Sequence, residues 1–128
     1  MHELAAAMSI VETALRALQG HSVKRVSRVN VEIGEFTFLV HDQLRFNFEI
    51  ASQKTILEGA ELCITHVPGR LRCDDCGFEG ESQPDPTLPS EIAVFAPMKC
   101  PNCGSSATVI TGGKEFYIRD IEAEIADM

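Results

Sequence analysis

Apolar residues recur every three or four positions through the first twenty residues, which predicts one amphipathic helix. A methionine in such a stripe is expected to pack in a core rather than to bind a metal. Gly20 is expected to end the helix, because glycine tolerates the left-handed backbone found at helix ends. The predicted buried face comprises Leu4, Met8, Val11, Leu15 and Leu18.

Alternating apolar and polar residues predict strands in three later segments. Residues 29–33 alternate until Gly34, as expected for a half-buried strand. A second strand is predicted over Glu61–Val67, where Cys63 is expected to pack as a small buried residue. Strand character returns at residues 116–121, and this last strand is expected to rejoin the first lobe.

Residues 40–52 fit both periods. Leu44, Phe46, Phe48 and Ile50 alternate as in a strand, yet residues 40, 44, 48 and 51 fall on one helical face. The length of the segment favours a helix of about a dozen residues. Asp42 is the expected N-cap, and the helix should end before Gly59.

The composition changes between residues 70 and 113, where Gly, Pro, Ser, Asp and Cys dominate. Such a segment buries too little apolar surface to fold without a covalent or metal staple. The pattern therefore predicts a main domain from residues 1–69 plus 114–128, with a small lobe of residues 70–113 inserted before the last strand.

Length and charge narrow the function classes. The 128 residues suit one domain with a smaller lobe, and the net charge of -8 disfavours general binding to nucleic acid. No apolar run reaches the ~18 residues needed to span a bilayer. The first residues lack the positive segment of a signal peptide, so we expect a cytoplasmic protein without a membrane partner.

Four of the five cysteines form two Cys-x-x-Cys-Gly motifs, Cys73/Cys76 and Cys100/Cys103. An odd cysteine count favours metal ligands over a disulfide framework. Two such motifs supply four thiolates, which suit tetrahedral zinc and leave no open position for catalysis. The sequence thus predicts a structural Zn(II) site, with the loop over Pro84–Pro89 projecting from it.

Other interpretations of these motifs remain open. A single Cys-x-x-Cys can be a redox pair, and four thiolates can also hold an iron–sulfur centre. A zinc ribbon can also serve as an interaction module of transcription-type machinery. Acidic residues around the motifs disfavour a nucleic-acid partner for such a module and leave a protein partner open.

The amino terminus offers a second set of metal donors. The α-amine of Met1, the amides of His2 and Glu3 and the His2 imidazole are consecutive nitrogen donors that suit square-planar Ni(II) or Cu(II). The first amides of a helix have no intrahelical acceptor, so they remain available to a metal. Taken alone, His2 could equally be an exposed or capping side chain.

Several motifs together resemble the HypA/HybF hydrogenase nickel-incorporation proteins. They are Met1-His2-Glu3-Leu4, Ile33-Gly34-Glu35, residues 55–62 and the two cysteine motifs. The resemblance implies an α+β fold in which two helices pack on a three-stranded mixed sheet, with an inserted zinc-ribbon lobe. It also implies a nickel metallochaperone that is not an enzyme, with Ni(II) as transient cargo at Met1, His2 and Glu3 and structural Zn(II) at Cys73, Cys76, Cys100 and Cys103.

The partners implied by the resemblance are the HypB GTPase and the large subunit of [NiFe]-hydrogenase, with urease as a further recipient. A homodimer is left open. Some relatives add a nickel donor after the first strand, and here His41 and Asp42 are weak candidates for it. His21 and His66 are interpreted as a helix-terminal cation and a strand histidine. The alternative function is a zinc-ribbon interaction module that binds no nickel.

Overall fold

The computed structural model describes residues 2–83 and 99–126, which form two compact units. The first unit combines Met1–Ile33, Leu39–His66 and Phe116–Met128. The second combines Gly34–Phe38 with Val67–Glu115, so it also includes residues 34–38, 67–69 and 114–115, which lie outside the predicted lobe of residues 70–113. Neither helix in the described ranges is both long and apolar enough to cross a membrane.

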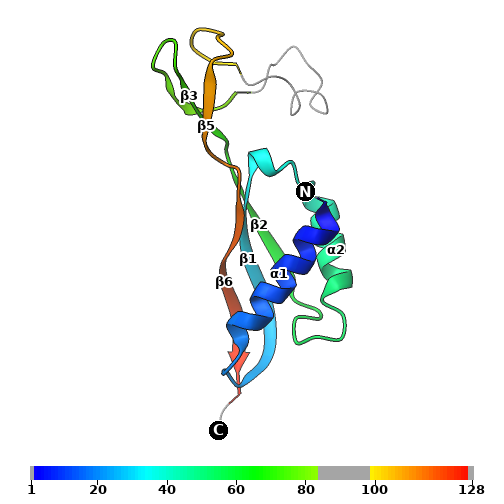
Figure 1. Ribbon diagram of the computed structural model, residues 1–128. Helices are drawn as coiled ribbons and strands as arrows, with labels where there is room; N and C mark the ends of the chain where they lie inside the picture. The colour runs from blue at the N-terminus through cyan, green and yellow to red at the C-terminus, as the bar shows by residue number, and fades with distance from the viewer. Residues whose placement is uncertain (1, 84–98, 127–128) are drawn as a thin grey trace. The chain divides into compact units, whose positions relative to one another are not determined.

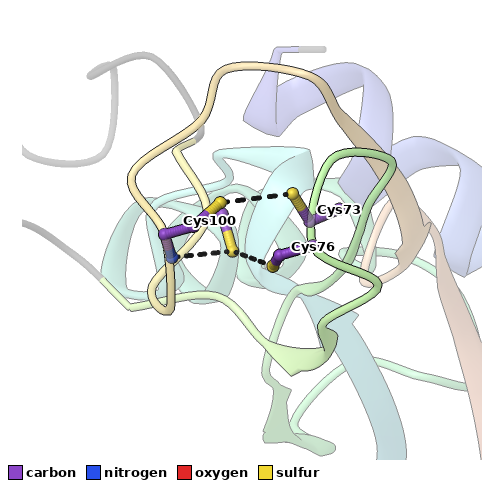
Figure 2. A group of neighbouring side chains, drawn as sticks. Cys73, Cys76 and Cys100 are labelled. Carbon is purple, nitrogen blue, oxygen red and sulfur yellow. Dashed lines mark hydrogen bonds between the residues drawn. The ribbon is translucent and has the colours of Figure 1, made fainter.

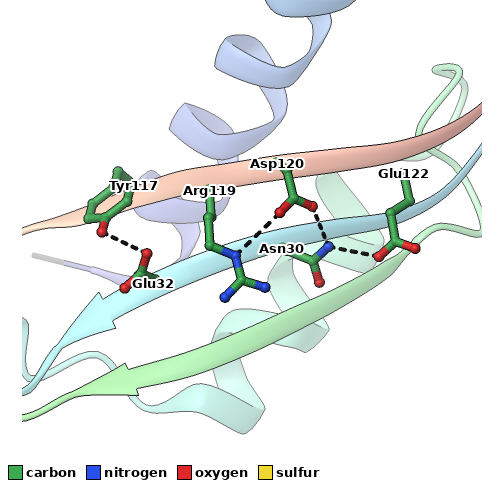
Figure 3. Close-up of polar contacts among 6 residues, drawn as sticks. All are labelled: Asn30, Glu32, Tyr117, Arg119, Asp120 and Glu122. Atoms are coloured by element: carbon green, nitrogen blue, oxygen red, sulfur yellow. Dashed lines mark hydrogen bonds and ion pairs between the residues drawn. The ribbon is translucent and has the colours of Figure 1, made fainter.

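The first unit is a three-stranded sheet covered by two helices, as predicted (Figure 1). The sheet order is β2-β1-β6. β1 and β6 are antiparallel, whereas the arrows of β1 and β2 point the same way in Figure 3, so the sheet is mixed. The elements are α1 (Glu3–Leu18), β1 (Val23–Gly34), α2 (His41–Ala51), β2 (Glu61–Val67) and β6 (Phe116–Ile125).

Helix α1 was predicted correctly, but part of its buried face was not. Gly20 adopts a φ of 84° just after the helix, as expected of a C-terminal stop. Leu4 and Met8 are about half exposed, at 48% and 50%. The buried face instead contains Ala6, Ala7, Ile10, Val11 and Ala14. Small alanine side chains let the helix backbone approach its neighbours closely, so the larger apolar residues lie at the edge of the contact.

Residues 41–51 form helix α2, which confirms the helical interpretation of the ambiguous segment. Leu44 and Phe48 are buried, while Phe46 on the opposite side is 62% exposed. The predicted N-cap was wrong. Val40 occupies that position, and Asp42 lies in the first turn. A carboxylate there still stabilises the helix, because it interacts with the positive end of the helix dipole.

The two phenylalanines of α2 allow a matched test of this packing. Phe48→Ala should lower the free energy of unfolding by about 3–5 kcal/mol, because it leaves a cavity in the core of the first unit. Phe46→Ala should change it by less than about 0.5 kcal/mol, since that side chain lies in solvent. Urea unfolding followed by circular dichroism measures both; equal effects would contradict the burial described here.

Strand β1 separates an apolar from a polar face of the sheet. Val29, Val31 and Ile33 are buried, while the alternate residues join β1 to β6 through polar contacts (Figure 3). The Asn30 amide donates to Asp120 Oδ1 at 2.6 Å and to Glu122 Oε2 at 2.8 Å. The first of these bonds lowers the pKa of Asp120. Strands β1 and β6 are therefore joined by side-chain hydrogen bonds as well as by the hydrogen bonds of the backbone ladder.

The second unit contains a small antiparallel sheet and little apolar core. Its strands are β3 (Arg70–Cys73), β4 (Glu79–Glu81) and β5 (Thr108–Gly112), in the order β4-β3-β5, with the short helix η1 (Glu35–Thr37). Among its described residues, the buried apolar side chains are Leu71, Cys73 and Cys100. Two of the three are cysteines, which supports the prediction that this lobe requires a staple.

Glycines permit close backbone packing within the second unit. A Cβ on Gly34 would lie 2.3 Å from the carbonyl oxygen of Gly113, and one on Gly113 would lie 2.7 Å from Gly69 Cα. The Glu35 carboxylate accepts hydrogen bonds from Gly69 N at 2.7 Å and from Ser82 Oγ at 2.9 Å. Residues 34–38 are thus bound to the strands that carry the cysteines.

Candidate metal sites

The two cysteine motifs face each other in the second unit (Figure 2). Cys73 is the last residue of β3, and its motif forms the turn into β4. The other motif, Cys100/Cys103, precedes β5, which pairs with β3 on the opposite edge. Pairing β3 with both neighbours brings together two motifs that are separated by 23 residues in the sequence.

The four sulfur atoms all lie within 4.8 Å of one another. Two separations between the motifs are short: Cys73 Sγ is 3.6 Å from Cys103 Sγ, and Cys76 Sγ is 3.5 Å from Cys100 Sγ. Tetrahedral zinc with bonds of ~2.3 Å would hold its sulfurs roughly 3.8 Å apart. The arrangement therefore fits one tetrahedral ion between the motifs.

The same distances weigh against the other interpretations of the cysteines. A redox Cys-x-x-Cys pair needs only the two sulfurs of one motif, whereas here the sulfurs of both motifs converge on one point. An iron–sulfur cluster with several iron atoms would spread its four cysteines further apart than a single ion does. Cys63, on β2 of the first unit, is not part of the cluster and is only partly buried, contrary to its predicted packing in the core.

Both motifs share one backbone turn, which explains the glycine that follows each. Gly77 and Gly104 have φ values of 78° and 76°, in the left-handed region that glycine adopts without strain. Their N–H groups, however, donate to the carbonyls of Cys73 at 3.0 Å and Cys100 at 2.9 Å, rather than toward sulfur. The glycine closes the turn and leaves the sulfurs to other donors.

Asn102 supplies some of those donors. Its backbone N–H donates to Cys100 Sγ at 3.3 Å, and its side-chain amide donates to Cys76 Sγ at 3.5 Å. The Asn102 amide, followed by the backbone amide of Phe78, lowers the pKa of the Cys76 thiol to about 6. Hydrogen bonds of this kind stabilise a thiolate, the form that binds metal.

Cys103 shows why the cluster needs a cation. The backbone hydrogen bond from Ser105 favours its thiolate, but burial and hydrogen bonds with Cys76 and the other sulfurs outweigh this and raise its pKa to about 12. The neighbouring sulfurs therefore disfavour the thiolate form of Cys103. A divalent ion bound between the sulfurs would offset this, because a coordinated thiol is deprotonated.

Polar contacts join the two motifs independently of a metal. Ser105 Oγ donates to Asp75 Oδ2, so a residue after the second motif binds a residue inside the first. Asp74 N donates to the Ala107 carbonyl at 2.9 Å, and Ala107 N donates to Ser105 Oγ at 3.0 Å. These contacts hold the two turns in register. The loop predicted to project over Pro84–Pro89 lies outside the described residues.

The second candidate site begins at the amino terminus of the first unit. His2 occupies the N-cap position of α1 with an exposed side chain and extended backbone (φ -84°, ψ 146°). Its carbonyl accepts the first helical hydrogen bond from Ala6 N at 3.0 Å. Its imidazole makes no capping bond. Met1 lies outside the described residues.

Glu3 connects the starts of the two helices. Its Oε1 accepts a hydrogen bond at 3.1 Å from the backbone N–H of Val40, the N-cap residue of α2. This bond, and a weaker one from the backbone of Glu3 itself, lower the pKa of the carboxyl. A glutamate in a capping box performs the same task within a single helix. Here the acceptor comes from another helix, so the ends of α1 and α2 lie together.

Glu3→Ala should therefore destabilise the metal-free protein by about 0.5–1 kcal/mol at neutral pH, the cost of losing an exposed helix cap. Because the folded pKa of Glu3 is lowered, its stabilisation is present above the unfolded pKa of about 4.3 and is lost as the pH falls through the folded value. Urea unfolding at neutral and acidic pH, with Glu12→Ala as the control on α1, measures this. A deficit that persists in acid would contradict the assignment.

The other histidines occupy distinct positions. His41 is the first residue of α2, and its ring centre lies 5.9 Å from that of His66, near the end of β2. Asp42, the other weak candidate for a nickel donor, is ion-paired with Arg45 at 3.1 Å. His21 is exposed beyond the end of α1.

The sequence did not reveal three features of these sites: the role of Asn102, the Glu3–Val40 hydrogen bond and the His41–His66 contact. Asn102 was visible as a polar residue inside the second cysteine motif, and its position next to Cys103 could have indicated a donor to sulfur. The Glu3–Val40 bond and the His41–His66 contact join residues 37 and 25 positions apart, and no local pattern marks either pair.

Comparison with known proteins places these sites in context. Residues 1–123 match the family profile described as hydrogenase/urease nickel incorporation, metallochaperone, HypA. The chain is 36% identical to the hydrogenase maturation factor HypA of Methanocaldococcus jannaschii, over 99% of this chain and 100% of that protein. It is 41% identical to the HypA factor of Methanococcus aeolicus, over 94% of each chain.

Solved structures show the same fold. The solution structure of the Ni metallochaperone HypA from Helicobacter pylori superposes with a TM-score of 0.65 at 21% identity, over 98% of this chain and 100% of that one. A second solution structure of a HypA protein gives a TM-score of 0.53 at 22% identity, over 94% of this chain and 92% of that one. At these identities the likeness establishes the fold.

Proposed function

The chain belongs to the HypA family, and from this membership we propose that it binds Ni(II) at its amino terminus and delivers it for the maturation of a [NiFe]-hydrogenase. The observation that carries the proposal is the family match, which begins at Met1 and includes the Met-His-Glu terminus. No specific observation favours the alternative of a transcription-type zinc ribbon.

The proposed nickel ligands are the Met1 amine, the amides of His2 and Glu3 and the His2 imidazole. The exposed imidazole of His2 and its place at the N-cap support this, because the amides at that end of a helix have no intrahelical acceptors. Four nitrogen donors in a plane suit Ni(II). The Glu3 carboxylate offsets part of the positive helix end and of the ion's charge.

Zn(II) is proposed to occupy the cluster of Cys73, Cys76, Cys100 and Cys103. The sulfur separations support one tetrahedral ion, and the full coordination sphere supports a structural role. Zinc would supply stabilisation here, and no chemistry of transfer is assigned to it. The chain's own contribution is the pair of turns, together with the N–H donors of Asn102 that favour thiolates.

Two metal sites that release their ions at different rates suit a delivery protein. A chelate built from the first residues can open without unfolding a domain, whereas four thiolates hold zinc through two connected turns. The proposed chelate takes its four nitrogen donors from the amino terminus alone, so His41 and Asp42, which is ion-paired with Arg45, are not included in it. Nickel exchange then leaves the second unit intact.

The family resemblance extends the proposal to partners. They are the HypB GTPase and the hydrogenase large subunit, with urease as a second recipient; a homodimer remains part of the proposal. Delivery needs no catalytic step, so the chain is proposed not to be an enzyme. Reduced cysteines as metal ligands fit a cytoplasmic location.

A transfer experiment tests the proposed function. The chain without a tag, loaded with Ni(II), is mixed with a nickel-free hydrogenase large-subunit precursor, and the nickel content of the re-isolated precursor is measured. We expect nickel to move to the precursor from the natural chain and not from His2→Ala mixed with the same amount of metal. Equal transfer from both, or transfer no faster than from free Ni(II), would contradict the proposal.

A further inference from the structure

His41 and His66 bring two imidazoles together from different elements of the first unit. Their ring centres are 5.9 Å apart, with the ring planes inclined at 50°. His66 is exposed near the end of β2, and His41 is partly buried at the start of α2. The pair is therefore fixed on one side by the helix start and open to solvent on the other.

This separation is compatible with two imidazoles that share one metal ion. With metal–nitrogen bonds of about 2.0–2.1 Å, the centres of two such rings lie roughly 4.5 Å apart at a right angle at the metal and roughly 6.4 Å apart when the rings are opposite each other. The observed value lies within that range.

We propose that His41 and His66 form a second exchangeable site for a divalent late transition metal, separate from the amino-terminal chelate and from the four cysteines. Imidazole suits Ni(II), Cu(II) and Zn(II), and the structure contributes two donors from the described residues. The remaining positions are open to water or to donors from an incoming partner.

The charges around the pair permit a cation. Arg45, the nearby cation, is ion-paired with Asp42 in the first turn of α2. The Glu3 carboxylate accepts from Val40 N immediately before His41 and offsets the positive helix end. Burial, and then the neighbouring His66, lower the pKa of His41, so its imidazole is neutral at pH 7 and has a free electron pair.

A site with two donors and open positions holds a metal weakly and exchanges it quickly. If the proposed nickel function holds, which this role rests on, the His41–His66 pair holds Ni(II) next to the helix ends that the Glu3–Val40 bond joins. The metal-binding claim itself does not depend on nickel being the cargo, because it can be tested with the metal alone.

The test separates the two nickel sites by blocking one of them. A chain carrying one extra residue before Met1, with its cysteines filled by zinc, is titrated with Ni(II) and separately with Cu(II) by isothermal calorimetry. We expect one weak equivalent to remain. His66→Gln and His41→Gln should each weaken it roughly tenfold or more. His21→Gln, an exposed histidine elsewhere in the unit, should leave it unchanged.

The outcomes distinguish this inference from the proposed function. Absence of any remaining equivalent in the blocked chain, or an equivalent that survives His66→Gln, overturns the two-histidine site. Ring signals of His41 and His66 that fail to shift together in NMR spectra on addition of Zn(II) overturn it as well. Failure of the amino-terminal chelate would be seen separately, as tight nickel binding that the extra residue does not change.

Discussion

Cys73→Ala is expected to unfold the second unit and to leave the first folded. Zinc in small modules contributes roughly 10–16 kcal/mol in peptide measurements, which is comparable to the whole stability of a typical domain. Cys73 also supplies one of the three buried apolar side chains among the described residues of that unit, so its removal affects packing as well as the metal.

Two-dimensional amide NMR spectra of the zinc-loaded variant test this expectation. Signals from β3, β4 and β5 should collapse into the unfolded range, while those of α1, α2 and β1 keep their positions. Cys63→Ala is the matched control, because Cys63 lies on β2 outside the cluster. A Cys73→Ala variant with dispersed signals throughout and a normal zinc content would contradict the structural role of the site.

His2→Ala is expected to abolish tight Ni(II) binding without changing the fold. The side chain is exposed and makes no capping bond, so the free energy of unfolding should change by less than about 0.5 kcal/mol. Loss of the imidazole leaves the amine and amides without the donor that completes the square plane. Nickel affinity should fall by at least about a hundredfold, because the loss of a ligand itself costs more than the roughly 10–100-fold caused by changing a residue that orients a ligand.

Calorimetric titration of the untagged variant measures that loss, with His21→Ala as the control histidine beyond the end of α1. Binding should also weaken as the pH falls, because protons compete with the metal for its nitrogen donors. If the folded His2→Ala variant bound Ni(II) like the natural chain, the chelate would have to be assigned to other residues.

Local patterns predicted most of the fold. Strand β2 begins and ends at the predicted residues, because the signals that define it are local: the alternation of its side chains and the Pro68-Gly69 pair that follows it. The cysteine cluster was predictable for a similar reason: four ligands for one ion impose a spacing that the sequence displays directly.

Features that depend on distant neighbours could not be predicted in this way. The edge position of Leu4 and Met8 depends on which side of α1 meets α2 and the sheet, and the helical period does not specify that direction. Asp42 was a reasonable N-cap by residue type, but the Glu3 carboxylate from another helix provides the bond at Val40. Such contacts exist only after the helices have packed.

A nickel titration of two matched chains tests the central claim most directly. One begins at Met1 with a free amine, and the other carries a single additional residue before Met1, which converts that amine to an amide. We expect the first to bind one Ni(II) tightly and to develop the absorption of a square-planar nitrogen complex, and the second to lose both. Equal affinity and identical spectra for the two chains would show that the amino terminus does not hold the metal.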